Sequence, residues 1–127
     1  MNGDQKFLVC ELCGNLVGLI NDKGIPLVCC GEHMKLLVPN TEDGSMEKHL
    51  PVINVLGDSV NVKVGGQLHP MEDGHHITFV YLETELGGQR KRIKIGAEPQ
   101  LTFKIADDKP IAVYAHCNIH GLWKTMV

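Results

Sequence analysis

Two closely spaced cysteine pairs near the start of the chain constrain its folding more than any other feature of the sequence. The pairs are Cys10-Glu-Leu-Cys13 and the adjacent residues Cys29-Cys30. The two-residue spacing brings both thiolates of the first pair to one side of a tight turn, as in metal sites. The adjacent pair requires a kink, because neighbouring side chains of extended backbone point to opposite faces. We therefore predict that Cys10, Cys13, Cys29 and Cys30 together bind one zinc or iron ion.

The segment around these cysteines is too short to be stabilised by a hydrophobic core alone. It ends near Pro39, where the polar stretch Pro39–Ser45 is rich in turn-forming residues and is typical of a linker. Metal binding in such sites contributes on the order of 10 kcal/mol, which is comparable to the net stability of a whole domain. We expect a metal-folded domain over residues 1–38 and a second domain over residues 39–127.

The second domain shows the alternation of half-buried β-strands and no sustained helical period. Val60, Val62 and Val64 alternate with polar residues, so one face of this segment is apolar. Other strand-like runs of this domain, separated by turn-forming residues, cover residues 76–83, 92–95, 101–105 and 111–116, and shorter runs in the first domain cover residues 6–9, 16–20 and 36–38. Several short strands at this spacing predict an all-β protein whose second domain is an immunoglobulin-like β-sandwich.

Composition and charge exclude several classes of function. The chain has 127 residues, 43% of them hydrophobic, and a formal net charge of −3, which gives no reason to expect nucleic acid or an acidic membrane as a partner. No apolar run reaches the ~20 residues of a membrane helix, and Met1–Phe7 lacks the features of a secretory signal. We therefore expect a cytoplasmic protein, in whose reducing surroundings clustered cysteines bind metals rather than form disulfides.

A second group of candidate metal ligands lies in the second domain. Cys117 and His120 have the two-residue spacing of a ligand pair. Strand alternation places Cys117 on the core face of its strand and His116 on the opposite face, so we expect His116 to be a surface residue. Further candidates stand near loop–strand junctions upstream: His49, His69, and His75 or His76. Alternation cannot choose between the last two, because both faces of the strand that follows carry apolar residues.

Taken together, these motifs resemble desulfoferrodoxin, the two-iron superoxide reductase. Over essentially the whole chain the sequence reads Cys-x2-Cys, Cys-Cys, Glu-Lys-His-x-Pro, His-Pro-Met with a second His, and Cys-x2-His-Gly-x-Trp. The resemblance implies a desulforedoxin-like domain that binds one iron through four cysteines. It also implies a second iron with four equatorial histidines and an axial cysteine: His49, His69, His75, His120 and Cys117. Glu47 and Lys48 match the family's mobile loop beside the open face of that iron.

The resemblance implies that the chain catalyses the one-electron reduction of superoxide to hydrogen peroxide. Neutral imidazoles and one thiolate leave a ferrous centre with a net positive charge, and five ligands leave the sixth position open to the anion. A thiolate opposite that position donates electron density toward the substrate. We expect Lys48 to raise the local superoxide concentration and Glu47 to bind the ferric iron after turnover. A rubredoxin-like electron donor and a homodimer are further implications of the resemblance.

Two other classes of protein share part of the pattern. Cys117, His120 and Met126 after an upstream histidine resemble the ligands of a copper electron carrier, but the other histidines then stay unexplained. A zinc ribbon followed by an interaction domain accounts for the N-terminal cysteines, but not for the spacing of Cys117 and His120.

Overall fold

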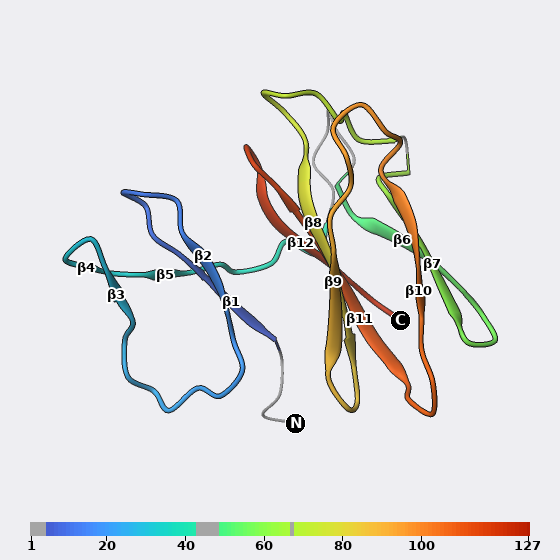
Figure 1. The fold of residues 1–127 in the computed structure, drawn as a ribbon, viewed down its shortest axis with the longest axis horizontal. Coiled ribbons are helices and arrows are strands. Elements are labelled where there is room, and N and C mark those ends of the chain that lie inside the picture. The colour runs from blue at the N-terminus through green and yellow to red at the C-terminus, as the bar shows by residue number, and fades with distance from the viewer. Residues whose placement is uncertain (1–4, 43–48, 67) are drawn as a thin grey trace. The chain divides into compact units, whose positions relative to one another are not determined.

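A computed structural model describes residues 5–42, 49–66 and 68–127 of the chain (Figure 1). Every regular element within these residues is a β-strand, which confirms the predicted all-β class. The described residues include no helix that could cross a membrane. The chain divides into two compact units, Met1–Val38 and Pro39–Val127.

The described part of the first unit has five short strands: β1 (Lys6–Val9), β2 (Leu16–Leu19), β3 (Val28–Cys29), β4 (Glu32–His33) and β5 (Lys35–Leu36). Strand β1 pairs with β2 and β5 in one antiparallel sheet, and β3 pairs with β4. Phe7, Leu8 and Cys10 are buried, whereas Ile20 and Ile25 are exposed. A unit with so small a core is expected to depend on a metal for its stability.

The described part of the second unit has seven strands: β6 (Pro51–Leu56), β7 (Ser59–Val64), β8 (Ile77–Thr84), β9 (Gly88–Lys91), β10 (Gln100–Lys104), β11 (Pro110–Cys117) and β12 (Gly121–Met126). They make two antiparallel sheets, with strand orders β10-β7-β6 and β12-β11-β8-β9 (Figure 1). Side chains from both sheets form one hydrophobic core, so the second unit is the predicted β-sandwich.

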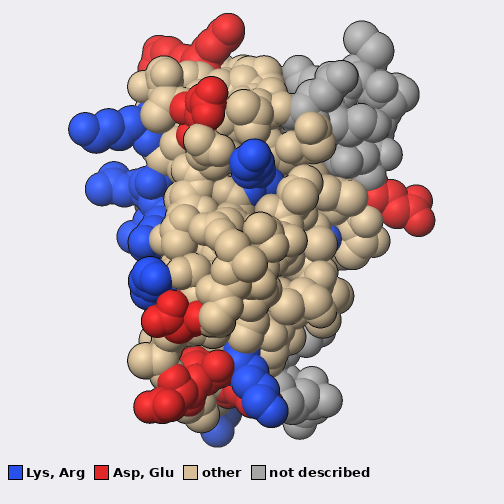
Figure 2. Space-filling model, turned by 90° about the vertical axis from the view of Figure 1, so that its right-hand side faces the viewer, with Lys and Arg blue, Asp and Glu red and all other residues tan. Residues whose placement is uncertain are grey.

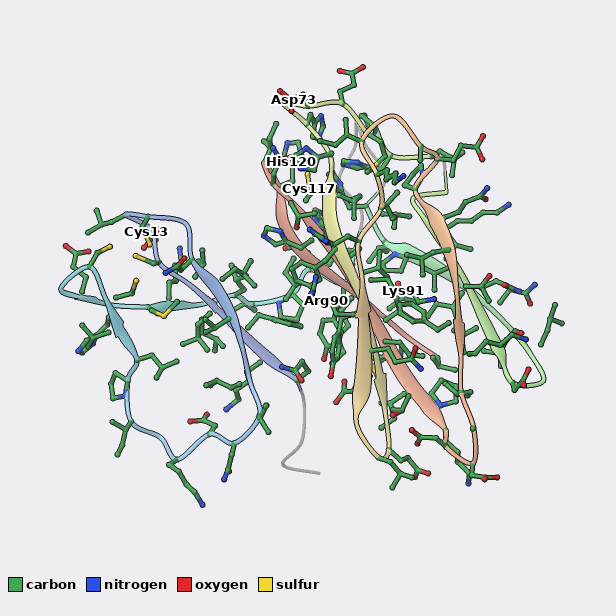
Figure 3. All side chains as sticks on the ribbon, viewed as in Figure 1. Cys13, Asp73, Arg90, Lys91, Cys117 and His120 are labelled. Atoms are coloured by element: carbon green, nitrogen blue, oxygen red, sulfur yellow. The ribbon has the colours of Figure 1, made fainter. Side chains whose placement is uncertain are left out.

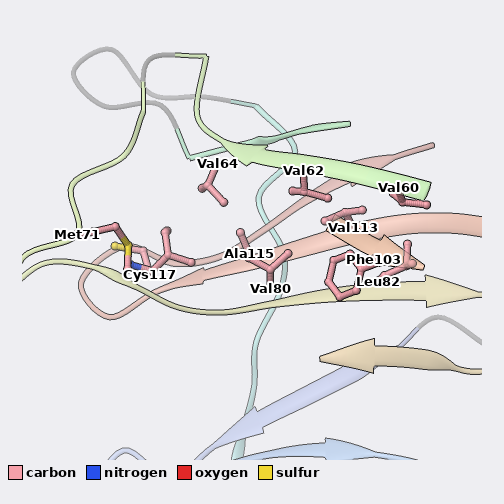
Figure 4. Packing of buried hydrophobic residues seen from close by; sticks show 11 residues of the cluster. Val60, Val62, Val64, Met71, Val80, Leu82, Phe103, Val113, Ala115 and Cys117 are labelled. Atoms are coloured by element: carbon pink, nitrogen blue, oxygen red, sulfur yellow. The ribbon is translucent and has the colours of Figure 1, made fainter. Parts of the chain in front are cut away.

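The sandwich core extends to the place where metal ligands were predicted. The inner face of β7 contributes Val60, Val62 and Val64, as their alternation with polar residues predicted. Cys117, the last residue of β11, is fully buried in the same cluster, which confirms its predicted place on the core face. Figure 4 shows Cys117 and Met71 together at one end of this cluster.

One predicted strand is wrong, and several strands were not predicted. Residues 92–95 lie outside the sheet, because β9 already ends at Lys91. Ile93 packs against the core from this loop, so its apolar character reflects burial rather than strand pairing. Strands β6, β9 and β12 were not predicted. Most residues of β6 and β9 are exposed, and the buried residues of β12 are adjacent, so none of the three alternates between buried and exposed positions. Strands β3 and β4 have two residues each and are too short to show any alternation.

Candidate metal centres

Four sulfur atoms converge at one end of the first unit. The Sγ atoms of Cys10, Cys13, Cys29 and Cys30 all lie within 4.8 Å of one another, and Figure 3 shows sulfur atoms gathered around Cys13. None of these cysteines is in a disulfide. The turn after β1 is closed by two backbone hydrogen bonds of 2.8 Å, from Cys10 N to Asn15 O and from Gly14 N to Cys10 O. The turn thereby holds both cysteines of the first pair on one side.

The adjacent cysteine pair has the kink that its sequence predicted. Cys30 adopts a left-handed backbone with φ of 54°, and Gly31 follows with φ of 76°. A left-handed conformation is unfavourable for a residue with a side chain. Here it allows two consecutive Sγ atoms to reach one point, which an extended backbone would prevent.

The hydrogen bonds around the four thiols favour loss of the first proton at Cys10. The backbone N–H of Cys13 points at Sγ of Cys10 at 3.5 Å and lowers the pKa of Cys10 to about 7. Hydrogen bonding to Cys13, and then to Cys10, raises the pKa of Cys30 to about 12. Four thiolates this close together repel one another, so a bound cation would stabilise the fully deprotonated set. This donor set fits zinc or iron.

Five further ligand atoms converge in the second unit. Nitrogen or sulfur atoms of five residues all lie within 4.8 Å of one another: His49, His69, His75, Cys117 and His120. His49 precedes β6, His69 and His75 lie between β7 and β8, Cys117 ends β11, and His120 lies in the turn before β12. Figure 3 shows Cys117 and His120 together at one end of the sandwich, near the loop that contains Asp73.

The four histidine rings follow one another in a closed circuit. Ring centroids are 4.6 Å apart for His49 and His69, 4.7 Å for His69 and His75, 5.2 Å for His75 and His120, and 4.9 Å for His120 and His49. Sγ of Cys117 lies 3.8 Å from Nδ1 of His120. Four imidazoles in a circuit with one thiolate beside them form a donor set that suits iron.

The structure separates His75 from its neighbour His76. Nε2 of His75 is shielded from solvent, and His75 belongs to the ligand group. The ring of His76 instead donates a hydrogen bond from Nδ1 to the backbone carbonyl of Glu72 at 3.0 Å. Strand alternation left open whether His75 or His76 is the candidate ligand, and the structure favours His75.

His116 lies outside the ligand group, on the side of β11 opposite Cys117. Its ring stacks on Phe79 with centroids 5.5 Å apart, and its Nδ1 lies 2.6 Å from Oγ1 of Thr78. The residue is half-buried rather than a surface histidine, and this burial lowers its pKa.

Three contacts that orient the histidines were not predicted from the sequence. Nδ1 of His69 lies 2.8 Å from the carbonyl oxygen of Pro70. A carbonyl only accepts hydrogen bonds, so Nδ1 carries the proton and Nε2 keeps its lone pair for a metal. Trp123 stacks on His49, with centroids 4.4 Å apart and planes at 11°, and its Nε1 donates to His120 O at 3.2 Å. The only sequence signal was the position of Trp123 shortly after His120.

Glu47 and Lys48 lie outside the described residues. Their roles as iron-binding and substrate-attracting side chains stay predictions from the sequence.

Comparison with known proteins covers both units. The family model Desulfoferrodoxin matches residues 41–126, and the model of the desulfoferrodoxin N-terminal domain matches residues 2–37. A desulfoferrodoxin from Nitratidesulfovibrio vulgaris is 43% identical, with 98% of each chain covered. A desulfoferrodoxin homolog from Archaeoglobus fulgidus is 42% identical, over 91% of this chain and 92% of that protein. The crystal structure of the superoxide reductase from Treponema pallidum superposes with a TM-score of 0.84 at 31% identity, covering 96% of this chain and 98% of that one. On this evidence the chain belongs to the desulfoferrodoxin family.

Proposed function

We propose that the chain is a superoxide reductase with two iron sites. The observation that carries the proposal is the convergence of four histidines and Cys117 within 4.8 Å, in a chain of the desulfoferrodoxin family. The reaction takes one superoxide anion, one electron and two protons to one molecule of hydrogen peroxide. Within this proposal, residues 1–38 form the desulforedoxin-like iron-binding domain, and residues 39–127 form the catalytic domain.

The burial of the ligands supports a substrate position that faces solvent. Cys117, His49 and His69 are buried, His75 is partly buried, and His120 is exposed. The thiolate therefore lies on the protein side of the group, and His120 lies on the side that reaches solvent. Five ligands leave one position of an octahedral iron site for a sixth group. We assign that position to superoxide.

Each protein group has a separate part in the reaction. An iron ion held by these five residues would supply the electron that converts superoxide to peroxide. The hydrogen bond from His69 to Pro70 O keeps that imidazole neutral and oriented, so the site retains a net positive charge. The thiolate of Cys117, buried in the core, would donate electron density to the bound metal.

Attraction of superoxide requires a local positive charge, because the whole chain has a formal net charge of −3. On the face drawn in Figure 2, basic side chains gather along one edge and acidic side chains lie mainly toward the ends. A local positive charge can raise the association rate of an anion even when the net charge of the chain is negative. We assign the local attraction to Lys48, and the sixth ligand of the resting ferric iron to Glu47.

The remaining parts of the proposal concern the setting of the enzyme. Every turnover consumes an electron, so a reduced carrier is needed, and a rubredoxin-like protein fits this requirement. We further propose that the protein is a cytoplasmic homodimer. The family resemblance supports the dimer, and the clustered free thiols support a reducing compartment.

Product stoichiometry tests the proposed reaction. Purified protein is loaded with iron, reduced and mixed with a known amount of superoxide, and hydrogen peroxide and oxygen are then measured. A reductase yields one peroxide per superoxide and no oxygen, whereas a dismutase yields half as much peroxide together with oxygen. The variant C117S serves as the control, because it keeps the histidines and removes the thiolate. Release of oxygen, or an unreactive ferrous site, would contradict the proposal.

A further inference from the structure

We infer that Asn118 is a positioning residue that holds His75 in the ligand circuit by tying its loop to the turn that contains Cys117 and His120. This inference depends on the proposed function in one respect: it assumes that the metal bound by the histidines and Cys117 is iron. Asn118 is exposed and does not belong to the ligand group, so it acts through its neighbours and not as a ligand.

Three hydrogen bonds connect Asn118 to the two residues that flank His75. Its Oδ1 accepts from the backbone N–H of His76 at 2.9 Å, and its Nδ2 donates to the carbonyl of Gly74 at 3.0 Å. Its own backbone N–H donates to the carbonyl of His76 at 3.1 Å. One side chain therefore spans the peptide segment that bears His75, while its backbone continues directly from Cys117.

The regular sheet ladder is interrupted at this point. The register of β8 against β11 shifts between His116 and Cys117, so that Cys117 pairs with Ile77 and Thr78 is an extra residue of β8. A bulge of this kind disrupts the ladder of backbone hydrogen bonds locally. The Asn118 amide provides hydrogen bonds across the same two segments, just beyond the place where the ladder is irregular.

Two backbone hydrogen bonds close the loop that bears His75 on itself. Glu72 N donates to His75 O at 2.9 Å, and His75 N donates to Glu72 O at 3.1 Å. These bonds define the shape of a small hairpin, but they do not determine where the hairpin lies relative to Cys117. The side-chain amide of Asn118 adds to the backbone bond between Asn118 and His76 in fixing this position, because it offers both an acceptor for His76 and a donor for Gly74. The substitution N118D would keep the acceptor and lose the donor.

Loss of this connection should move His75 without removing any ligand. The ring centroid of His75 lies 4.7 Å from that of His69 and 5.2 Å from that of His120, so a small displacement of its loop changes the circuit. We expect release of the second iron to a chelator to become about tenfold faster in N118A, because two hydrogen bonds are lost. The ferric absorption band of this iron should shift, while the band of the four-cysteine iron should not.

The test combines amide exchange with metal release in the full chain. In wild-type protein, N118A and N118D, we would measure hydrogen exchange at the His76 amide, the rate of iron release and the ferric spectrum. N118A should expose the His76 amide to exchange and release iron faster. N118D should keep this amide protected and still release iron faster than wild-type protein. N54A, which replaces an asparagine on the edge strand β6, is the matched control and should behave as wild type.

Several outcomes would overturn the inference. They are an equally protected His76 amide in N118A, an unchanged ferric spectrum, or iron release as slow as in wild type. If N118A does not fold, N118D decides, because it retains the acceptor for His76 and replaces the donor to Gly74 with a carboxylate oxygen. Neither exchange nor iron release depends on superoxide chemistry. A chain that failed the product measurement could therefore still confirm the role of Asn118, and the two failures remain distinguishable.

Discussion

Replacing Trp123 with phenylalanine is expected to destabilise the sandwich unit by about 2 kcal/mol and to loosen the histidine circuit. The phenyl ring keeps an aromatic face for His49 but has no N–H for the carbonyl of His120, which Trp123 reaches at 3.2 Å. The lost hydrogen bond costs about 1 kcal/mol. Trp123 is only 8% exposed. The smaller ring buries roughly 40 Å² less apolar surface, which adds about 1 kcal/mol.

The alanine variant extends this reasoning to both contacts at once. W123A removes the stack on His49 as well as the hydrogen bond to His120, and large-to-small changes of buried aromatic residues cost about 3–5 kcal/mol. Urea unfolding of the metal-free protein, followed by far-ultraviolet circular dichroism, gives the unfolding midpoint of each variant. The shift of this midpoint from wild type measures the loss of stability. L82A is the matched control, because Leu82 is fully buried in the core and lies toward the end of β8 that is remote from His75. Its expected cost is about 2–5 kcal/mol.

Iron release separates the contribution of Trp123 to the metal site from its contribution to general stability. If Trp123 positions His49 and His120, W123A loses its second iron faster than L82A at a similar loss of unfolding free energy. Equal release rates in the two variants would refute this positioning role. An unchanged urea midpoint in W123F would refute the assigned hydrogen bond.

Three further predictions concern charges and hydrogen bonds elsewhere. Asn15 Nδ2 donates to Sγ of Cys29 at 3.6 Å. Since such bonds stabilise the reduced state, N15L should lower the reduction potential of the four-cysteine iron in a spectroelectrochemical titration; an unchanged potential would contradict this. The Thr84 hydroxyl, aided by backbone amides, lowers the pKa of Asp108 from 3.8. D108A should therefore melt below wild type at neutral pH, and the difference should vanish as the pH falls through that lowered pKa; a difference that persists in strong acid would have another cause. K48I should slow oxidation of the ferrous second site by superoxide in pulse radiolysis, by a factor within ~10–10³, and weaken its dependence on salt; an identical rate would remove Lys48 from the mechanism.

The parts of the site that follow from local rules were predictable from the sequence. Adjacent cysteines cannot meet one ion from extended backbone, and Cys30 has the left-handed conformation that this requires. Alternation along β11 places Val113, Ala115 and Cys117 on one face, and all three belong to the core. Each of these conclusions depends on neighbours within a few residues, for which spacing alone is informative.

Contacts between distant segments could not be predicted in this way. Asn118 meets Gly74 and His76 across more than forty positions, and no local period marks such a contact. The same holds for Trp123, whose stack on His49 joins the two ends of the sandwich sequence. Residues 92–95 were wrongly predicted as a strand. Ile93 is apolar because it packs on the core from a loop, and sequence alternation does not distinguish this from a strand. Tertiary packing determines these features.

The two ligand sets differ in how far they reach along the chain, and this imposes an order on metal loading during synthesis. Cysteine ligands of the first site lie between positions 10 and 30, whereas the second set extends from 49 to 120. A ribosome needs about 5–20 s to add the residues that separate Cys30 from His120. The first ion can therefore be captured by a nascent chain. The second ion can bind only after β11 and β12 have been synthesised and the sandwich has folded. Binding of the second ion therefore indicates that this domain is complete.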